Sequence, residues 1–279
     1  MKVSVIIPTY NEENVIGECL SSLMKQNYKN LELIVVDDGS ADNTIKTIEH
    51  YPVKLFKQKH LGAGSARNLG AKHSIGQILV FVDADMTFDK EFIECLVKPI
   101  IEKKTIGTFS KDEYVSNKNN TWSKCWNINK GLPIDKMHPL DYPDTQPVFR
   151  AILKKEFERV GGFDLIGYID DHTLSVKLGK KANVAVGAIF YHKNPDNLRE
   201  IFNQARWIGK SEFKNRKIKN EFIMKFISII RYSFPFTLIF GVIKSIQYGL
   251  LQFLIFKIVY DTAVEISLIN SFIGEHKYK

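Results

Sequence analysis

Cysteine is scarce in this chain. Its 279 residues include three cysteines, Cys19, Cys95 and Cys125, which lie far apart and lack the spacing of a metal-binding motif. An odd number of widely separated cysteines argues against a disulfide framework and favours a reducing compartment. The first residues, MKVSVIIP, also lack the apolar segment and cleavage site of a secretory signal peptide, so we expect no such leader.

A long uninterrupted apolar run is missing too. Residues 222–273 are mostly apolar, but charged residues interrupt them at Lys225, Arg231, Lys244, Lys257, Asp261 and Glu265. A membrane-spanning helix here would hold Lys244 near the middle of the bilayer, at a cost of roughly 2.5–3.5 kcal/mol. Three interpretations stay open: a tilted or hairpin membrane segment, a helix pair in the membrane interface, and a soluble helical cap. Flanking aromatic residues and a preceding basic cluster favour membrane association.

Two common nucleotide-binding fingerprints are absent. The stretch Gly62–Gly70 reads GAGSARNLG, which fails the dinucleotide spacing G-x-G-x-x-G, and the chain has no G-K-[ST] of a P-loop. The stretch is nevertheless a glycine-rich turn that enters a helix pattern. Such a turn allows a phosphate to approach the backbone closely.

The charge balance favours anionic partners. The formal net charge is +8, which suits nucleotides or phospholipid headgroups. The basic residues gather beside the apolar tail and not among aromatic residues of a sheet, so we expect no nucleic-acid partner. We expect a catalytic domain over residues 1–215, followed by a basic linker and apolar helical tail over residues 216–279.

The first hundred residues alternate strand and helix patterns. Apolar, β-branched strands are predicted at Val3–Ile7, Leu31–Val36, Val53–Phe56 and Ile78–Val82, and helices at Asn14–Gln26, Asp42–His50, Ser65–Ser74 and Lys90–Glu102. This alternation predicts an α/β fold with a mostly parallel sheet covered by helices on both faces. In such sheets ligands bind beyond the carboxyl ends of the strands.

The second half of the chain is less regular. Residues 104–144 give no firm pattern, although Trp122 and Trp126 lie there and can either stack on a sugar ring or pack in a core. Further strands are predicted at Gln146–Leu153 and Val184–Tyr191, and further helices at Asp171–Leu178 and Leu198–Phe213.

Acidic residues follow two of the predicted strands. Asp37 and Asp38 end one, and either cap the next helix or accept hydrogen bonds from a nucleotide base or ribose. Asp83 and Asp85 end another, and either cap a turn or bind Mg²⁺ or Mn²⁺, which favour oxygen ligands and substrate phosphates.

Three later features also carry two interpretations. Asp170 and Asp171 precede a helix and serve either as caps or, facing a sugar, as a general base. His192 ends a predicted strand and is either structural or a ligand. Arg206 and Trp207 lie on a predicted helix, where the arginine either faces solvent or clamps a diphosphate.

The order of these motifs resembles that of the family 2 glycosyltransferases, which have the GT-A fold. The resemblance covers about residues 2–213, and rests on VSVIIPTYNEE, LELIVVDDGSADNT, GAGSARNLG, FVDADM, the GGFD turn, the Asp170–Asp171 pair and NQARW. The first half matches closely and the second half more loosely. Asn203 replaces the glutamine of the family's Q-x-x-R-W motif, which favours addition of a single sugar over processive polymerisation.

The resemblance implies a role for each matched residue. Residues implied to bind the nucleotide sugar are Pro8, Thr9, Tyr10, Glu12, Asp38, Arg67, Asp83, Arg206 and Trp207. The metal, Mg²⁺ or Mn²⁺, is implied to lie at Asp85 with Asp83 and His192. Asp171 matches the catalytic base, with Asp170 beside it.

The predicted function is inverting transfer of one sugar from a UDP- or GDP-linked donor to a glycan or polyprenyl-linked acceptor. The apolar tail predicts a place on the cytoplasmic side of the cell membrane. Two alternatives are a catalytically inactive scaffold protein of the same fold and a sugar nucleotidyltransferase. The acidic PTYNEE after the first strand counts against the nucleotidyltransferase, which needs a basic, glycine-rich loop there.

Overall fold

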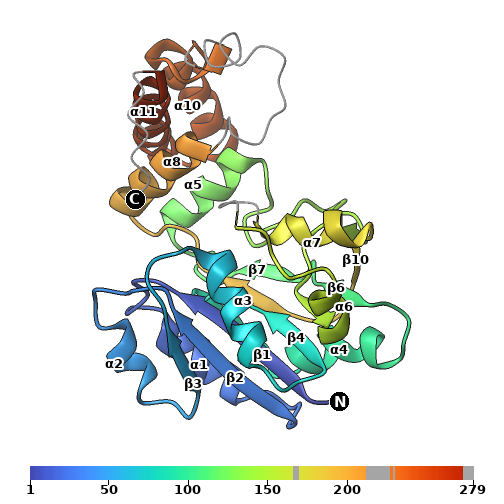
Figure 1. Cartoon of the computed structure of the whole chain (residues 1–279). Coiled ribbons are helices and arrows are strands. Elements are labelled where there is room, and N and C mark those ends of the chain that lie inside the picture. The colour runs from blue at the N-terminus through green and yellow to red at the C-terminus, as the bar shows by residue number, and fades with distance from the viewer. Residues whose placement is uncertain (166–169, 212–226, 229, 273–279) are drawn as a thin grey trace. The chain divides into compact units, whose positions relative to one another are not determined.

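The computed structural model of the chain describes residues 1–165, 170–211, 227–228 and 230–272. The chain forms two units, and neither is a continuous stretch (Figure 1). The first unit contains Met1–Tyr114 and His138–Lys193, and the second contains Val115–Met137 and Asn194–Lys279. The predicted domain boundary between residues 215 and 216 lies outside the described residues and stays a prediction.

The predicted parallel strands of the first unit are confirmed. They are β1 (Val3–Thr9), β2 (Leu31–Asp37), β3 (Lys54–Lys57) and β4 (Ile78–Phe81). They lie in the order β3-β2-β1-β4, and every neighbouring pair is parallel. The register places Thr9 opposite Asp37, so the carboxyl ends of β1 and β2 meet at one edge of the sheet.

The sheet continues as a mixed one, in which four of the seven neighbouring pairs are parallel, as the prediction of a mostly parallel sheet requires. Its further strands are β9 (Ala151–Leu153), β6 (Gly107–Phe109), β10 (Ala182–Val184) and β8 (Thr145–Gln146). Strand β9 runs antiparallel to both β4 and β6. A separate three-stranded sheet contains β5 (Met86–Phe88), β11 (Phe190–His192) and β7 (Glu113–Val115), in the order β5-β11-β7.

Each strand predicted in the second half is two short strands. The predicted strand Gln146–Leu153 contains the end of β8 and all of β9, because Pro147 has no backbone N–H for a ladder. The predicted strand Val184–Tyr191 joins β10 to β11 across Gly187, whose φ of 80° turns the chain between two sheets.

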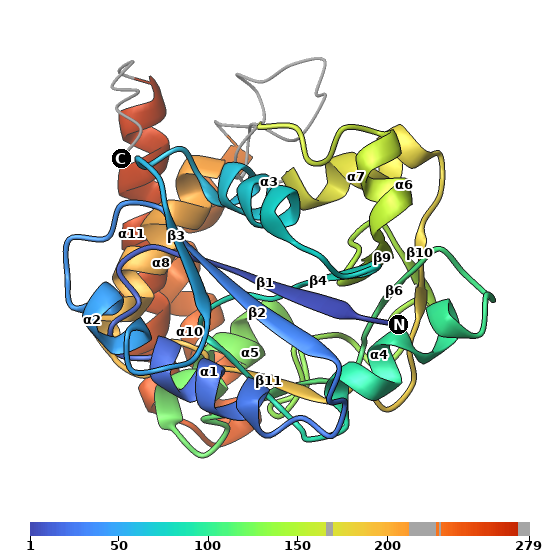
Figure 2. The same cartoon turned by 60° about the horizontal axis from the view of Figure 1, so that its bottom comes forward.

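Helices cover both faces of the large sheet (Figure 2). Side chains alternate along each strand, so Val5 and Ile7 of β1 pack with α1 (Ile16–Met24) and α4 (Phe92–Ile101). The intervening Ile6 packs on the opposite face, in a cluster that includes residues of α3 (Ala63–His73), α6 (Lys154–Arg159) and α7 (Asp170–Leu178). Helix α2 (Thr44–Ile48) adds Ile48 to the first face.

The second unit is helical. Its helices are α5 (Thr121–Lys130), α8 (Leu198–Ser211), α10 (Phe234–Tyr248) and α11 (Gln252–Phe272). Trp126 is almost fully buried, with its ring 5.6 Å from the ring of Tyr260 and 6.4 Å from that of Phe256. Trp122 packs against the same cluster. These two tryptophans therefore belong to a core, which favours packing over sugar stacking.

Helix α10 buries its small residues and exposes its large apolar ones. Its buried positions are Thr237, Gly241 and Ser245, spaced four residues apart. Its exposed large apolar side chains are Phe234, Phe236, Ile239, Phe240, Val242, Ile243, Ile246 and Tyr248. In the described part of the chain, no helix combines the length and apolar character that crossing a bilayer requires.

Candidate functional site

The carboxyl-end edge of the parallel strands holds polar side chains without partners. Among the described residues, the buried oxygens Thr9 Oγ1, Asp37 Oδ1 and Asp171 Oδ1 accept or donate no hydrogen bond. Leaving a buried polar group unpaired costs about 1–3 kcal/mol. Such groups are rare in folded proteins, and each is an atom that a polar ligand can pair.

Asp38 organises the loop that precedes α3. Its Oδ1 accepts hydrogen bonds from the Leu61 N–H at 2.8 Å and from Gln58 Nε2 at 2.6 Å. Its Oδ2 accepts one from the Gly62 N–H at 2.9 Å and lies 2.9 Å from His60 Nδ1. Both carboxylate oxygens thus hold the protein's own loop, and direct contact with a nucleotide base stays a prediction.

His60 extends this loop toward the end of β1. Its ring stacks on that of Tyr10, with ring centroids 4.0 Å apart and an interplanar angle of 26°. Tyr10 is partly exposed, at 42%. Pro8 lies within β1, opposite Val36 in the register, and its side chain is buried. Among the predicted base-binding residues, Tyr10 and Asp38 are therefore linked through His60.

Asp83 lies between two arginines. Arg67 Nη2, from α3, is 2.7 Å from Asp83 Oδ1, and Arg150 Nη1 is 3.1 Å from Asp83 Oδ2. Burial alone would raise the pKa of Asp83, but the guanidinium groups of Arg150 and Arg67 hold it well below its usual range. Asp83 is therefore a permanent anion that fixes two cations beside the site.

The small sheet brings Asp85 and His192 together. Asp85 precedes β5, and His192 ends β11 opposite Met86. His192 Nε2 lies 2.9 Å from Asp85 Oδ2, and His192 Nδ1 lies 3.0 Å from Oε1 of Glu113 at the start of β7. Burial alone would lower the pKa of His192, but the carboxylates of Asp85 and Glu113 raise it to about 10.

Glu113 contacts a second histidine. His138 Nε2 lies 2.9 Å from Glu113 Oε2, and the ring of His138 stacks on that of Tyr142 at 4.0 Å. Burial alone would raise the pKa of Glu113, but its hydrogen bonds with His138 and His192 lower it well below its usual range. A continuous chain of contacts therefore runs Asp85–His192–Glu113–His138.

The donor set for a metal is smaller than the sequence predicted. In the described part of the chain, no three His, Cys, Asp or Glu side chains come together as metal ligands. Asp83 does not join Asp85 and His192 because both of its oxygens face arginines. What remains is the Asp85 carboxylate and His192, whose Nε2 must release its proton to bind a cation. With that proton released, the pair fits Mg²⁺ or Mn²⁺ if phosphate oxygens and water supply the other ligands.

The pKa of Glu12, in the loop after β1, is raised by its surroundings. Burial, with the nearby carboxylates of Asp85, Asp42 and Asp83, raises the pKa of Glu12 to about 7. Its backbone N–H donates to Thr44 Oγ1 at 2.7 Å, which fixes the loop after β1. Burial is the first cause of the raised pKa, and repulsion from the neighbouring carboxylates is the second.

The Asp170–Asp171 pair opens α7. Asp170 is buried against α3, where a side chain on Gly64 would overlap the Asp170 carboxylate. Burial raises the pKa of Asp170. Asp171 is partly exposed, yet its Oδ1 is buried without a hydrogen-bond partner among the described residues. Asp170 thus anchors the turn, and Asp171 keeps an acceptor atom available.

Arg206 and Trp207 lie on α8 in the second unit. Arg206 places its guanidinium 5.9 Å from the centroid of the Phe202 ring, and its Nε is buried without a hydrogen-bond partner among the described residues. Trp207 is half exposed. Their contact with a nucleotide sugar stays a prediction.

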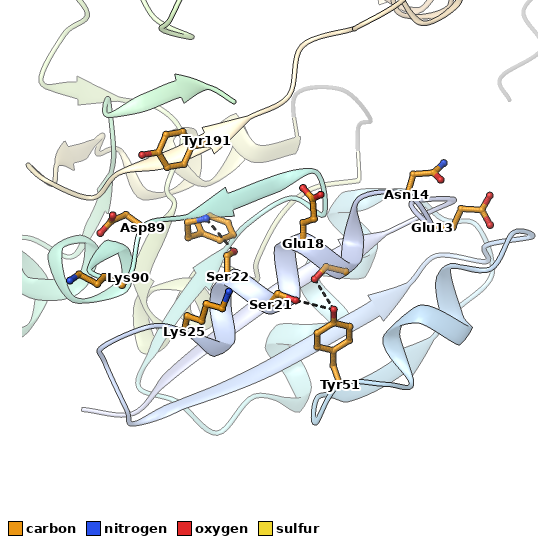
Figure 3. Close-up of a pocket in the computed structure, with 12 residues that line it drawn as sticks. Glu13, Asn14, Glu18, Ser21, Ser22, Lys25, Tyr51, Asp89, Lys90 and Tyr191 are labelled. Atoms are coloured by element: carbon orange, nitrogen blue, oxygen red, sulfur yellow. Dashed lines mark hydrogen bonds between the residues drawn. The ribbon is translucent and has the colours of Figure 1, made fainter. Parts of the chain in front are cut away.

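A groove beside α1 is a separate feature of the first unit (Figure 3). Its volume is about 750 Å³, and its lining includes Glu18, Lys25, Tyr51 and Tyr191. Tyr51 closes one side by donating to the Gly17 carbonyl at 2.9 Å. None of the predicted site residues lines this groove, so it is distinct from the strand-end site.

Sequence reasoning missed four residues of the strand-end site: His60, Glu113, His138 and Arg150. Only Arg150 carried a signal, as a charged residue directly before the buried strand β9. Glu113 and His138 lie in the stretch that gave no pattern. Their role arises from pairing between β7 and β11, whose residues lie almost 80 positions apart in the chain.

Comparison with known proteins decides the family. Residues 4–161, more than half of the chain, match the protein family described as glycosyl transferase family 2. The chain belongs to this family. The match covers the parallel strands and the strand-end residues Thr9, Asp38, Asp83 and Asp85, which is the half that resembled the family most closely.

Curated members of the family resemble part of this glycosyltransferase chain. The poly(ribitol-phosphate) beta-N-acetylglucosaminyltransferase TarS of Staphylococcus aureus is 42% identical over 102 residues, 34% of this chain and 18% of TarS. The UDP-Glc:alpha-D-GlcNAc-diphosphoundecaprenol beta-1,3-glucosyltransferase WfgD of Escherichia coli is 34% identical over 119 residues, 41% of this chain and 47% of WfgD. The matched region spans less than half of either relative.

Solved structures support the GT-A fold of the family 2 chain. S. aureus TarS 1–349 in complex with UDP-GlcNAc has a TM-score of 0.56 at 19% identity, covering 100% of this chain and 93% of that one. The mannosyltransferase PcManGT from Pyrobaculum calidifontis, in complex with GDP-Man and Mn²⁺, has a TM-score of 0.60 at 20% identity, covering 96% and 87%. At such identities the likeness concerns the fold alone.

Proposed function

We propose that this chain transfers a single sugar, with inversion, from a UDP- or GDP-linked donor to a hydroxyl or phosphate of an acceptor. The observation that carries the proposal is that Asp171 Oδ1 accepts no hydrogen bond among the described residues and lies 4.0 Å from His172 Nε2, in the unit where Thr9 Oγ1 and Asp37 Oδ1 also lack a hydrogen bond. A buried acceptor atom without a partner is suited to take a proton from an incoming hydroxyl.

The proposed reaction uses Asp171 as the base. Asp171 accepts the acceptor's proton, and the acceptor oxygen bonds to the anomeric carbon from the face opposite the nucleotide. The bond from that carbon to the diphosphate oxygen breaks, and the diphosphate leaves with the electron pair. This order of bond changes inverts the configuration at the anomeric carbon.

Asp85 and His192 would hold a divalent cation at the donor's diphosphate. When bound, the cation would act as a Lewis acid that offsets the charge developing on the leaving group. Asp83 keeps Arg67 and Arg150 fixed beside the same strand end, and fixed positive charge near a developing anion lowers the barrier because little reorganisation is needed. The donor candidates include UDP-GlcNAc and GDP-Man, which are bound in two structural neighbours, TarS 1–349 and PcManGT.

The acceptor side of the proposal rests on the second unit. We infer that α10 lies in the cytoplasmic interface of the cell membrane, because it exposes eight large apolar side chains and buries the small residues Thr237, Gly241 and Ser245. Helices in lipid pack through small residues and face apolar side chains outward. A lipid-linked acceptor would be presented at that surface, and the relative WfgD is a glucosyltransferase that acts on alpha-D-GlcNAc-diphosphoundecaprenol.

A thermal-shift screen of UDP- and GDP-sugars, with and without Mn²⁺, tests the donor proposal. A ligand at 100 times its Kd stabilises the folded state by about 2.7 kcal/mol, so the midpoint should rise with one donor. Asp85→Ala should lose the part of the shift that depends on Mn²⁺. Asp141→Ala, which removes an exposed carboxylate elsewhere, should keep it.

Analysis of the reaction products gives the second test, with the donor found in the screen. Incubation with donor and acceptor should release the nucleoside diphosphate and give a product of inverted anomeric configuration by NMR. If no nucleotide sugar shifts the midpoint and none is consumed, the chain is a scaffold and the proposal is wrong.

A further inference from the structure

The small sheet holds a buried carboxylate to which the proposed reaction assigns no role. Glu113 starts β7, and its side chain is only 8% exposed. It lies outside the motifs that identify the family, in the stretch where the sequence gave no pattern. Its two oxygens contact different histidines, His192 at 3.0 Å and His138 at 2.9 Å.

We propose that Glu113 is a positioning residue, which holds the His192 ring so that Nε2 faces the cation position at Asp85, and that His138 braces Glu113 from the other side. This inference rests on the proposed function, because it concerns how a cation is held there. Glu113 itself has no contact with Asp85 and acts through His192.

The hydrogen-bond geometry carries the first step. With His192 Nδ1 donating to Glu113 Oε1, the ring nitrogen left to face Asp85 is Nε2. A histidine that binds a metal generally donates its other ring N–H to a carboxylate or carbonyl, which fixes both ring orientation and tautomer. Glu113 supplies this partner without being a ligand itself.

The topology of the small sheet carries the second step. Asp85 precedes β5, His192 ends β11 and Glu113 starts β7, and the strands are hydrogen-bonded in the order β5-β11-β7. One side chain from each position thus forms a row across the sheet. A shift of β7 by one residue would turn Glu113 to the other face of the sheet. The register of the strand pairing therefore determines whether the Glu113 carboxylate can orient the His192 ring.

The surroundings of Glu113 carry the third step. His138 fixes Oε2 and stacks on Tyr142 with an interplanar angle of 8°, so the carboxylate is held at both oxygens. A carboxylate held in this way loses little entropy when it orients a neighbour. Arg150, which also lowers the pKa of Glu113, contributes positive charge from the side of Asp83.

The test measures Mn²⁺ affinity in the presence of UDP or GDP, using calorimetry or the EPR signal of free Mn²⁺. Changes to the hydrogen-bond partners of metal ligands typically cost 10–100-fold in metal affinity, and we expect a loss of about that size for Glu113→Gln. His138→Phe keeps a ring to stack on Tyr142 but removes the brace, and should lose about threefold or more. Nucleotide affinity without metal should stay unchanged in both variants.

Glu32→Gln is the matched control. Glu32 is also a buried glutamate, and it accepts hydrogen bonds from Ser4, Ile75 and Gly76. It lies near the start of β2, at the end of the strands opposite the candidate site. Its substitution should lower the thermal midpoint and leave Mn²⁺ affinity at the wild-type value. A loss of affinity in this control as large as in Glu113→Gln would show that the effect is only lost stability, and would overturn the inference.

The remaining outcomes separate the two proposals. Wild-type Mn²⁺ affinity in a folded Glu113→Gln variant overturns the positioning role and leaves the transferase proposal intact. If Glu113→Gln does not fold, wild-type affinity in His138→Phe overturns it instead. If the wild-type protein binds a nucleotide sugar but Mn²⁺ raises neither its affinity nor its thermal midpoint, this inference alone is overturned. If the wild-type protein binds no nucleotide sugar, the proposed function is overturned as well.

Discussion

The two units of the chain differ in the surfaces that they offer to a partner: the first has acidic side chains at its strand ends, and the second has an exposed apolar helix face. The first unit buries large apolar side chains on both faces of its sheet and leaves buried polar atoms unpaired at the strand ends. The second unit pairs the buried carboxylate of Asp261 with Lys257 and Thr237, each at 2.7 Å, and among its described residues Arg206 Nε and Ser245 Oγ are buried without a hydrogen-bond partner. Its α10 turns bulky apolar side chains outward.

The contrast indicates two different kinds of partner. Unpaired polar atoms are stabilised by a polar ligand, and exposed apolar surface is stabilised by an apolar one. We infer that the first unit is completed by a nucleotide sugar and the second by a membrane surface. The following changes test each half of this comparison, starting with the largest expected effect.

The unpaired Oδ1 of Asp171 can be tested directly. In Asp171→Asn the side chain keeps its shape but cannot accept the proton, so we expect the rate of transfer to fall at least ~10²-fold. Donor affinity, measured by calorimetry, should stay close to that of the wild type. A variant that transfers sugar at the wild-type rate would move the base to another residue.

The exposed face of α10 can be made polar. The double change Ile243→Ser and Ile246→Ser removes two exposed apolar side chains, each worth about 1.5–3 kcal/mol when fully buried in an apolar phase. We expect binding to anionic liposomes, measured by co-sedimentation, to fall at least about tenfold while the thermal midpoint stays unchanged. Leu140→Ser with Val186→Ser, exposed apolar positions in the first unit, should bind as the wild type does; equal loss in both pairs would contradict the assignment.

The close approach of α3 to Asp170 depends on a glycine. A Cβ at position 64 would overlap the Asp170 carboxylate, so Gly64→Ala should cost about 1–3 kcal/mol of unfolding free energy and lower activity by moving the adjacent Asp171. At Gly17 the nearest atoms to a Cβ lie at 3.4 Å, and Gly17→Ala in α1 should be neutral or stabilise by up to about 1 kcal/mol. Chemical denaturation measures both, and equal effects would contradict the packing argument.

The smallest effect concerns Glu32, at the edge of the sheet away from the site. Burial alone would raise its pKa, but hydrogen bonds from Lys54, Ser4 and the Ile75 N–H lower it. A carboxyl group with a lowered folded-state pKa stabilises the protein above its unfolded pKa, and the contribution is lost as the pH falls through the folded value. Glu32→Gln should therefore cost about 1 kcal/mol at pH 7 and progressively less below pH ~4. A pH-independent difference would show that the charge of Glu32 contributes nothing.

The parallel half of the fold followed from the sequence because its signals are local. Runs such as Val3–Ile7 and Ile78–Val82 are long, apolar and rich in β-branched residues, and each emerged as a strand with an end within two residues of the predicted one. Their carboxyl ends carry Asp38, Asp83 and Asp85, so the position of the site followed from the strand order.

The rest of the fold depends on pairing that is not local. Strands β6, β7, β9, β10 and β11 have three residues each, too few for an apolar pattern, and they are stable only beside partners far away in the chain. Because these contacts form between residues far apart in the chain, the sequence pattern indicated neither Glu113 nor His138. The same distance along the chain made Trp126 ambiguous, since its neighbours Phe256 and Tyr260 come from the other end of the sequence.

The discontinuous second unit has a consequence for how the chain is made. Helix α5 leaves the ribosome about 130 residues before Phe256 of α11, the aromatic neighbour of its Trp126. At a synthesis rate of ~5–20 residues per second, this tryptophan waits on the order of ten seconds for its neighbour. During that time the strands of the first unit, which end at His192, can pair while α5 is still uncovered. A newly made chain that stops before α11 would leave Trp126 uncovered, a natural target for chaperones.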